Sequence, residues 1–541
     1  MIKKLLKRVQ VTHSFFIMYF MVMVLLTSAN TFAQNVKKSH NVLFIAVDDL
    51  KPILGCYGDT LVKTPNIDRL AKKGTIFLSN YCQQAVCGPT RASLMTGKRP
   101  DYTKVWDLKT RMRDMNPDIV TIPQYFISQG YTAEGVGKIY HPTCVDKDVD
   151  GASWSEPFVK KVKEKYFAAG FGMPAAGHYQ LPETKAHILS NQGGDDGEKK
   201  NAQDEEEGTV SKMKAGPAVE CVDVPDDAYL DGADVNKALE MMKDLSGKDK
   251  PFFLAVGIHK PHLPFVSPKK YWDLYNRNDM PVAKFQEHAA NSPEIAYTRA
   301  NELRNYQDIP DLCTFTGQGN HIGLQLDKQK ELIHGYYAAV SYTDALVGKL
   351  LAELDALGET DNTIIILWGD HGWHLGDHDL WCKHTNFEQA THAPLIIAAP
   401  GIQPTKTNSQ SEFVDVFPTL CDLAGLPIPT YLDGKSLVPL MKDPKATVKD
   451  YSVSQYNRKL NKKQVEGYSV RTKRYRYTEW LADFKANHVY SESKIVGKEL
   501  YDYEKDQLET VSRIDDPEYK SVEKDMKAKL MDYFEKTKNN N

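Results

Sequence analysis

Apolar runs alternate with helical segments along most of the chain. Residues 41–47, Asn-Val-Leu-Phe-Ile-Ala-Val, are almost entirely apolar, which is typical of a strand buried on both faces of a mostly parallel sheet. Other runs of this kind predict further strands at 75–78, 131–136, 251–258, 363–368 and 394–399. These runs therefore predict one large sheet.

Helices are predicted between these strands. Residues 64–74 begin with Thr-Pro and end with Lys-Lys-Gly, which predicts a helix capped by Thr64, with proline at its first position and Gly74 past its end. Apolar residues at helical spacing predict further helices at 122–129, 235–245 and 336–357. The alternation of strands and helices indicates the α/β class.

Two parts of the chain depart from this pattern. Between 148 and 224 the periodicity weakens, and we interpret an acidic, glycine-containing stretch at about 190–210 as a solvated insertion, with binding of a basic partner as the alternative. Beyond residue 442, extended patterns at 468–480 and 499–503 and a helix at 519–537 predict a small α+β domain. We expect one large domain at 34–442 and a second at 443–541.

The first 33 residues have the layout of a secretory signal peptide. Four basic residues precede an apolar run at 15–26, and Thr31 and Ala33 are the small residues of the cleavage site. The alternative, a membrane anchor, is disfavoured because the run is shorter than the roughly 20 residues that a spanning helix needs. We therefore expect an exported protein, periplasmic or secreted, without a stable membrane anchor.

Charge excludes one class of partner. The 541 residues carry a formal net charge of -3, so the chain as a whole has no attraction for nucleic acid. Any affinity for anions has to be local.

Polar side chains gather at the predicted strand ends. Asp48-Asp49 follow the first strand, Lys138 and His141 follow another, and Asp370-His371 follow a third. Open α/β sheets bind ligands at the carboxyl ends of their strands, and aspartate oxygens are the hard ligands that Ca²⁺ or Mg²⁺ prefers. Taken singly, each of these residues also fits a loop cap, a surface position or, for His371, a hydrogen bond to a ligand.

Two more polar clusters come later in the chain. His259 and His262 follow the strand at 251–258 in a proline-bounded segment, which suits a pocket rim better than the helical i,i+4 spacing of a zinc site. Lys383 lies between the strands at 363–368 and 394–399.

Cys87 precedes a short predicted helix that ends at Gly97. The sequence Cys87-Gly88-Pro89-Thr90-Arg91 would put the cysteine at a helix N-terminus, where free N–H groups favour an anion. A cysteine alone is more often a small buried apolar residue. Cys-x-Pro-x-Arg followed by Leu-x-Thr-Gly, however, resembles the signature of the type I sulfatases.

The resemblance is closest to the iduronate-2-sulfatase branch of that family. Matching segments lie at 48–52, 83–87, 136–138, 252–265, 370–373, 391–394 and 467–477. It implies an alkaline-phosphatase-like fold, in which a large mixed sheet is flanked by helices and followed by a smaller C-terminal α+β domain. The acidic insertion and the later cysteine layout depart from the pattern, which leaves the substrate open because loops build pocket rims.

The resemblance also implies a cofactor set. Cys87 would be oxidised by a maturation enzyme to formylglycine, whose hydrate is the nucleophile. Ca²⁺, or Mg²⁺, would be held by Asp48, Asp49, residue 87, Asp370 and His371. Consumption of Cys87 would leave seven of the eight cysteines, an odd number, so we expect no disulfide scaffold.

The family's catalytic roles fall on six residues of this chain: Cys87, Arg91, Lys138, His141, His259 and Lys383. Arg91 would hold the formylglycine, and Lys138 and Lys383 would bind the sulfate. His141 would take a proton from the second hydroxyl as the sulfate hemiacetal breaks down. His259, or alternatively Lys383, would protonate the leaving oxygen.

Three functions fit the sequence. The leading hypothesis is an exported sulfatase acting on sulfated oligosaccharides, in particular on 2-O-sulfated uronic acids of glycosaminoglycan fragments. The second is a phosphomonoester or phosphonate hydrolase of the same fold. The third is a non-catalytic binder of sulfated glycans in which Cys87 remains a thiol.

Overall fold

The computed structural model of the chain describes residues 39–191, 216–298, 302–310, 323–461, 463–484 and 490–538. The expected signal peptide, Cys313 and nearly all of the expected acidic insertion lie outside these ranges. Residues from Asn41 onward form one compact unit.

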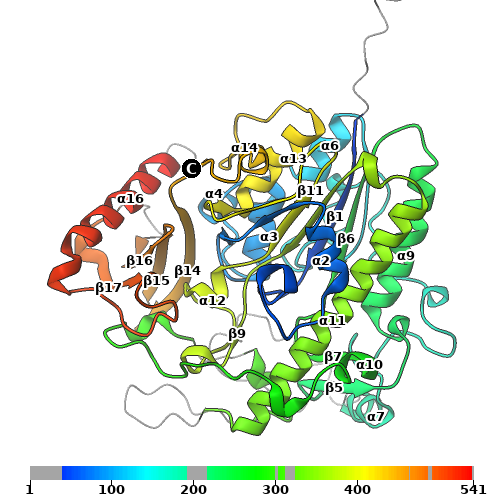
Figure 1. Ribbon diagram of the computed structural model, residues 1–541, viewed down its shortest axis with the longest axis horizontal. Helices are drawn as coiled ribbons and strands as arrows, with labels where there is room; N and C mark the ends of the chain where they lie inside the picture. Colours follow the sequence, from blue (N-terminus) through cyan, green and yellow to red (C-terminus); the bar gives the residue numbers. More distant parts are fainter. Residues whose placement is uncertain are drawn as a thin grey trace, which may run out of the picture. The chain divides into compact units, whose positions relative to one another are not determined.

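A seven-stranded mixed sheet forms the centre of this unit, which confirms the predicted fold class (Figure 1). Its strand order is β12-β2-β11-β8-β1-β6-β4. The last four strands of this order run parallel, namely β8 (Thr363–Gly369), β1 (Asn41–Val47), β6 (Phe252–Ile258) and β4 (Thr132–Gly137), which is an edge strand. Strand β11 (Leu395–Ala398) is antiparallel to β8, and β2 (Thr75–Phe77) and β12 (Thr405–Thr407) complete that edge.

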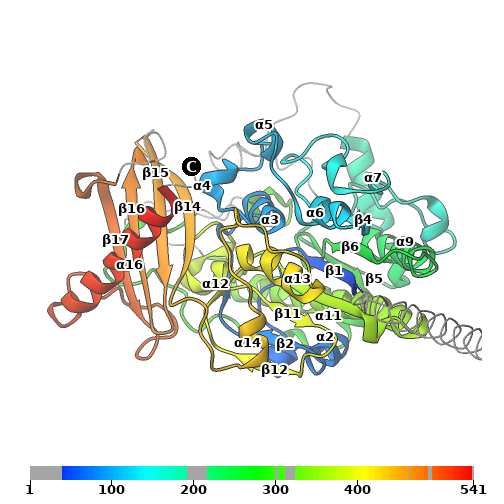
Figure 2. The same ribbon diagram turned by 90° about the horizontal axis from the view of Figure 1, so that it is seen from above.

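Helices cover both faces of the sheet because alternate residues of each strand point to opposite sides. Leu43, Ile45 and Val47 of β1 belong to the apolar core shared with α2 (Pro65–Ala71), α9 (Leu230–Ser246) and α11 (Leu326–Ala356). Val42, Phe44 and Ala46 belong to the core on the other face, with α3 (Cys87–Thr96), α6 (Ile122–Ser128) and α13 (Val416–Ala424). Figure 2 shows the sheet between these two layers.

Several helix predictions differ in detail from the structure, and α9 begins five residues before its predicted start at residue 235. The hydroxyl of Thr64 does not cap α2. It accepts instead from the N–H of Gly55 at 3.0 Å, so it ties the preceding turn to the helix. Helix α11 begins at Leu326, well before the predicted start at residue 336, because its first turns carry polar residues that hide the apolar period.

The C-terminal part is a four-stranded antiparallel sheet with one long helix, as the fold class predicted (Figure 1). Its elements are β14 (Ser452–Leu460), β15 (Lys463–Arg471), β16 (Tyr475–Ala482), β17 (Ile495–Asp502) and α16 (Lys520–Lys538). The single strand expected at 468–480 is a hairpin of β15 and β16, closed by the N–H of Thr472 donating to Tyr475 O at 2.8 Å. The domain boundary at 442 stays a prediction.

The C-terminal sheet is bonded directly to the segment that leads into α3. The N–H of Gln455 donates to Gln83 O at 2.7 Å, and the Ser454 hydroxyl donates to Cys82 O at 2.6 Å. Strand β14 therefore supports the backbone just ahead of Cys87. None of the helices among the described residues combines the length and the apolar character that crossing a bilayer requires.

Candidate functional site

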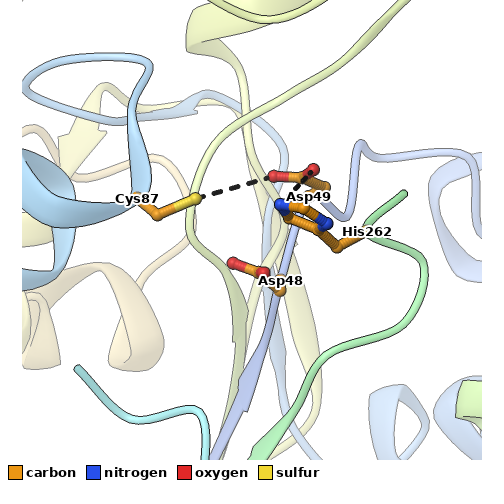
Figure 3. Close-up of side chains that lie close together, drawn as sticks. All are labelled: Asp48, Asp49, Cys87 and His262. Carbon is orange, nitrogen blue, oxygen red and sulfur yellow. Dashed lines mark hydrogen bonds and ion pairs between the residues drawn. The ribbon is translucent and has the colours of Figure 1, made fainter. Parts of the chain in front are cut away.

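The predicted residues at the strand ends meet around the first turn of α3. Asp48 and Asp49 follow β1, and Asp370 follows its parallel neighbour β8. Cys87 is the first residue of α3, and its thiol points toward the carboxylate of Asp49 (Figure 3). The His262 ring lies beside the same carboxylate.

Four potential ligands converge within this cluster. One ligand atom each from Asp49, Cys87, Asp370 and His371 lies within 4.8 Å of all the others, and all four residues are buried. Cys87 Sγ is 3.8 Å from Asp49 Oδ1 and 3.5 Å from His371 Nε2. Asp48, Asp49, Cys87 and His262 form a second, overlapping group of the same kind.

The tautomer of His371 favours a cation in this cluster. Its Nδ1 lies 2.9 Å from Gly372 O, and a carbonyl only accepts, so Nδ1 carries the hydrogen. In the neutral ring Nε2 then presents a lone pair toward Asp49 Oδ1 at 3.3 Å and Asp370 Oδ1 at 3.6 Å. Lone pairs that face one another are what a bound cation satisfies, so the donor set fits a divalent metal ion.

Three cations balance the three aspartates. The guanidinium of Arg91 bridges Asp48 and Asp370, with Nη2 to Asp48 Oδ1 and Nε to Asp370 Oδ2 both at 3.0 Å. Lys138 donates to the other oxygen of Asp48, and Lys383 Nζ lies 2.9 Å from Asp49 Oδ1. Burial alone would raise the pKa of Asp48, but the charges of Lys138 and Arg91 outweigh it and hold that pKa well below its ordinary value.

Two glycines bring Lys138 to the site. Gly137, at φ 77°, ends β4, and a Cβ added there would come 2.0 Å from Gly257 O. A Cβ added at Gly257 would come 2.2 Å from the carbonyl carbon of Lys138. The backbones of β4 and β6 therefore touch where side chains would separate them, and this contact places Lys138 beside Asp48.

His141 has the protonation state of a base. The Thr143 hydroxyl donates its hydrogen to Leu108 O, so its oxygen can only accept from His141 Nδ1, 2.8 Å away. Nδ1 therefore carries the ring hydrogen, and Nε2 of the neutral ring has a lone pair. Burial, reinforced by the charge of Lys138, lowers the pKa of His141 to about 3. The ring is neutral at pH 7 and can accept a proton.

The structure places His262, and not the expected His259, in the cluster. His259 Nδ1 lies 3.2 Å from Asp231 Oδ1, and the N–H groups of His259 and Lys260 also donate to Asp231. His262 Nε2 lies 3.7 Å from Asp49 Oδ2. The ammonium of Lys260 donates to His262 O at 2.6 Å, which folds the segment so that the second histidine turns inward.

His262 has the contacts of an acid. Its Nδ1 lies 2.5 Å from Leu263 O and its Nε2 lies 3.0 Å from Glu302 Oε1, and both oxygens only accept. A ring that carries hydrogen on both nitrogens satisfies both contacts, and this protonated form is the one that can donate a proton.

Sequence reasoning missed Glu302. Its carboxylate lies 3.1 Å from Lys383 Nζ as well as beside His262, so it joins the two side chains. Burial alone would raise the pKa of Glu302, but Lys383 and His262 hold it well below the ordinary value. No strand end or motif marks this residue in the sequence, since it lies in an irregular segment.

Comparison with known proteins connects this geometry to a family. The sequence model of the family described as Sulfatase matches residues 40–426, and the one described as N-sulphoglucosamine sulphohydrolase, C-terminal, matches residues 376–536. Human iduronate 2-sulfatase is 33% identical over 89% of this chain and 92% of its own length. N-acetylglucosamine-6-O-sulfatase of Bacteroides thetaiotaomicron is 26% identical over 93% of this chain and 88% of its own.

Solved structures agree on the fold. The phosphonate monoester hydrolase of Agrobacterium radiobacter superimposes with a TM-score of 0.65 at 22% identity, covering 91% of this chain and 95% of that one. At this identity the likeness shows the shared architecture alone. The family match and the relative at 33% identity show more than that: the chain belongs to the sulfatase family, the enzymes that hydrolyse sulfuric esters.

Proposed function

We propose that this sulfatase removes 2-O-sulfate groups from uronic acid residues of glycosaminoglycan-type oligosaccharides after export to the periplasm or the medium. The observation that carries the proposal is the buried convergence of Cys87 with three aspartates and three cationic side chains. The choice of substrate is supported by the identity to human iduronate 2-sulfatase, which extends over most of both chains.

The cofactors follow from the same cluster. Asp48, Asp49, Asp370, His371 and the oxygen of an oxidised residue 87 would hold one divalent cation, and their hard donors favour Ca²⁺, with Mg²⁺ as the alternative. The bound cation would draw electron density from a sulfate oxygen, and formylglycine made from Cys87 by a maturation enzyme would supply the attacking hydroxyl.

The chain's own residues would do the rest. Arg91, on α3, binds both Asp48 and Asp370, and so would fix the positions of these two carboxylates relative to residue 87. The ammonium groups of Lys138 and Lys383 have N–H donors to offer to sulfate oxygens and so would offset the charge that repels a nucleophile.

Proton transfer would be divided between two histidines. His262, when protonated beside Glu302, would donate a proton to the sugar oxygen as its bond to sulfur breaks. His141, neutral with a free Nε2, would accept a proton from a hydroxyl of residue 87 when sulfate is released. His259 would support the loop through Asp231.

Mass spectrometry and a substrate panel test the proposal. Protein produced with a maturation enzyme should show, in the peptide containing residues 81–91, the mass decrease expected when –CH₂SH becomes –CHO. That protein, but not Cys87→Ala, should desulfate disaccharides with a 2-O-sulfated uronic acid. A chelator should abolish activity and Ca²⁺ should restore it.

The alternatives predict other results. An unmodified thiol in fully exported protein would favour a glycan binder. Activity of Cys87→Ser on phosphate esters, with none of matured protein on sulfates, would favour a phosphoester hydrolase. Turnover of 6-O-sulfated or N-sulfated sugars only would leave the sulfatase assignment intact and overturn the 2-O-uronate specificity.

A further inference from the structure

Asp49 holds an unusual backbone conformation for a residue with so many contacts. Its φ is 55°, in the left-handed region that non-glycine residues rarely adopt, and its side chain is fully buried. The chain turns here, directly after β1, and the turn aims the carboxylate at Cys87 and His371. Such a conformation persists only when the surroundings fix it.

One hydroxyl group closes this turn from outside. Tyr336, on α11, donates from its OH to Asp49 O at 2.6 Å and accepts from the N–H of Lys51 at 3.0 Å. The same oxygen thus bonds to the backbone on both sides of Leu50. On the inner side, the N–H of Asp49 donates to Asp370 Oδ1 at 2.9 Å.

The hydroxyl has little freedom to move. The Tyr336 side chain is fully buried, in the middle of a helix of 31 residues. Its ring packs edge-on against Phe265, with centroids 5.4 Å apart, and lies parallel to Trp373 at 6.5 Å. The helix and the two rings therefore fix the point to which Asp49 O is bonded.

We propose that Tyr336 is a positioning residue for the metal site: its hydroxyl holds the left-handed turn at Asp49 and thereby directs the Asp49 carboxylate toward the bound cation. Tyr336 contributes no ligand atom. Its effect passes through the backbone of Asp49 to the carboxylate, so its loss weakens cation binding without removing a donor. The inference rests on the proposed function in one respect, namely that Asp49 is a metal ligand.

The next residue on the helix supplies a matched control. Tyr337 is 3% exposed, and its OH donates to Asp59 Oδ2 at 3.2 Å, away from Asp49. Tyr336→Phe and Tyr337→Phe thus each remove one buried hydroxyl from the same helix. Only the first removes a bond to Asp49.

The experiment is calorimetric titration of Ca²⁺ into matured, chelator-stripped full-length protein, paired with thermal denaturation with and without Ca²⁺. Tyr336→Phe is expected to bind Ca²⁺ about 10–100-fold more weakly than wild type, the range seen when a group supporting a metal ligand is removed. Its gain in Tm on Ca²⁺ addition should shrink accordingly. Tyr337→Phe should bind like wild type.

The outcomes separate the two proposals. Wild type that binds neither Ca²⁺ nor Mg²⁺ would refute the metal site and this inference together. Wild-type affinity in Tyr336→Phe, with binding intact in wild type, would refute the positioning role alone. A Tyr336→Phe chain that does not fold, beside a folded Tyr337→Phe, would assign the hydroxyl to stability and also overturn the inference.

Discussion

His259 and His262 are three positions apart and differ in what they touch, which predicts different effects of their removal. His262→Gln should lower turnover of a sulfated disaccharide by about 100-fold or more, because a sugar alkoxide leaves poorly without a proton. Its effect on 4-nitrophenyl sulfate should be far smaller, since nitrophenolate needs no proton. Steady-state kinetics on both substrates measures the difference.

His259→Gln is the control for that comparison. It should affect both substrates alike, because His259 contacts Asp231 and lies outside the cluster. If the loss of turnover depended on the leaving group in His259→Gln and not in His262→Gln, His259 would be the general acid.

His141 predicts a pH dependence of stability. Its pKa of about 3 in the folded chain lies below the unfolded value near 6.5, so the unfolded chain binds the extra proton between these values. The stability that neutral His141 confers is complete above pH 6.5 and is lost as the pH falls toward 3. Between pH 7 and 5, wild type should lose about 1 kcal/mol or more relative to His141→Gln, allowing for the partial exposure of the ring.

Melting curves of the two proteins at pH 7 and pH 5 test this. The Tm of wild type should fall more steeply on acidification than that of His141→Gln. Parallel declines would show that His141 already carries its proton in the folded chain at pH 5.

Single residues were predictable where a pattern pointed to them. Asp48, Asp49, Lys138 and Asp370 follow apolar strands, and the sheet brings strand ends together. Glu302 has no such marker, and it reaches Lys383 through tertiary folding alone. The choice between two histidines in one short loop depended on hydrogen bonds of Asp231 and Lys260 that no periodicity encodes.

At the scale of elements, the contact between β4 and β6 predicts the effect of one methyl group. Gly257→Ala would place a Cβ 2.2 Å from the Lys138 backbone, so the ends of the two strands have to separate. Activity should fall because Lys138 moves away from Asp48, and Tm should fall as well. In Gly247→Ala the new Cβ would meet nothing closer than 3.8 Å, so this variant is the control.

Equal activity of Gly257→Ala and Gly247→Ala would contradict this account of how Lys138 is placed. A crystal structure of Gly257→Ala should show the Lys138 ammonium displaced from the Asp48 carboxylate.

Elements were predictable in proportion to how continuous their patterns are. The run at 41–47 predicted β1 to the residue, because both faces of that strand are buried. Strands β15 and β16 merged into one prediction, since Thr472 to Arg474 turn the chain without glycine or proline. Strand β14 was missed because its second half is mostly polar and becomes progressively more exposed toward its end.

At the scale of the whole molecule, Glu388 joins the C-terminal sheet to the catalytic part. This residue of α12 (Glu388–Thr391) accepts from Arg471 Nε at 3.0 Å and from Arg476 Nη2 at 2.6 Å. Glu388→Gln would remove this partly buried counter-charge from the two guanidinium groups, at a cost of about 1–3 kcal/mol, since Arg476 keeps Glu509 as a partner. Thermal denaturation should show a Tm several degrees lower.

The exposed Glu287 provides the comparison, since Glu287→Gln should leave the Tm unchanged. Similar melting of the two variants would mean that the C-terminal sheet is held without Glu388. The sequence predicted that a second region exists. It did not predict this junction, because Arg471 and Arg476 lie 83 and 88 residues beyond Glu388 along the chain.

The burial of Cys87 limits when the protein can be matured. The side chain is 3% exposed, and every residue of α3 is buried. A maturation enzyme has to enclose this side chain in its own catalytic centre, which the folded chain does not permit. On the proposed function, oxidation of Cys87 must precede folding. Molecules that fold with an unmodified thiol stay inactive, and they could be matured only after they are denatured again.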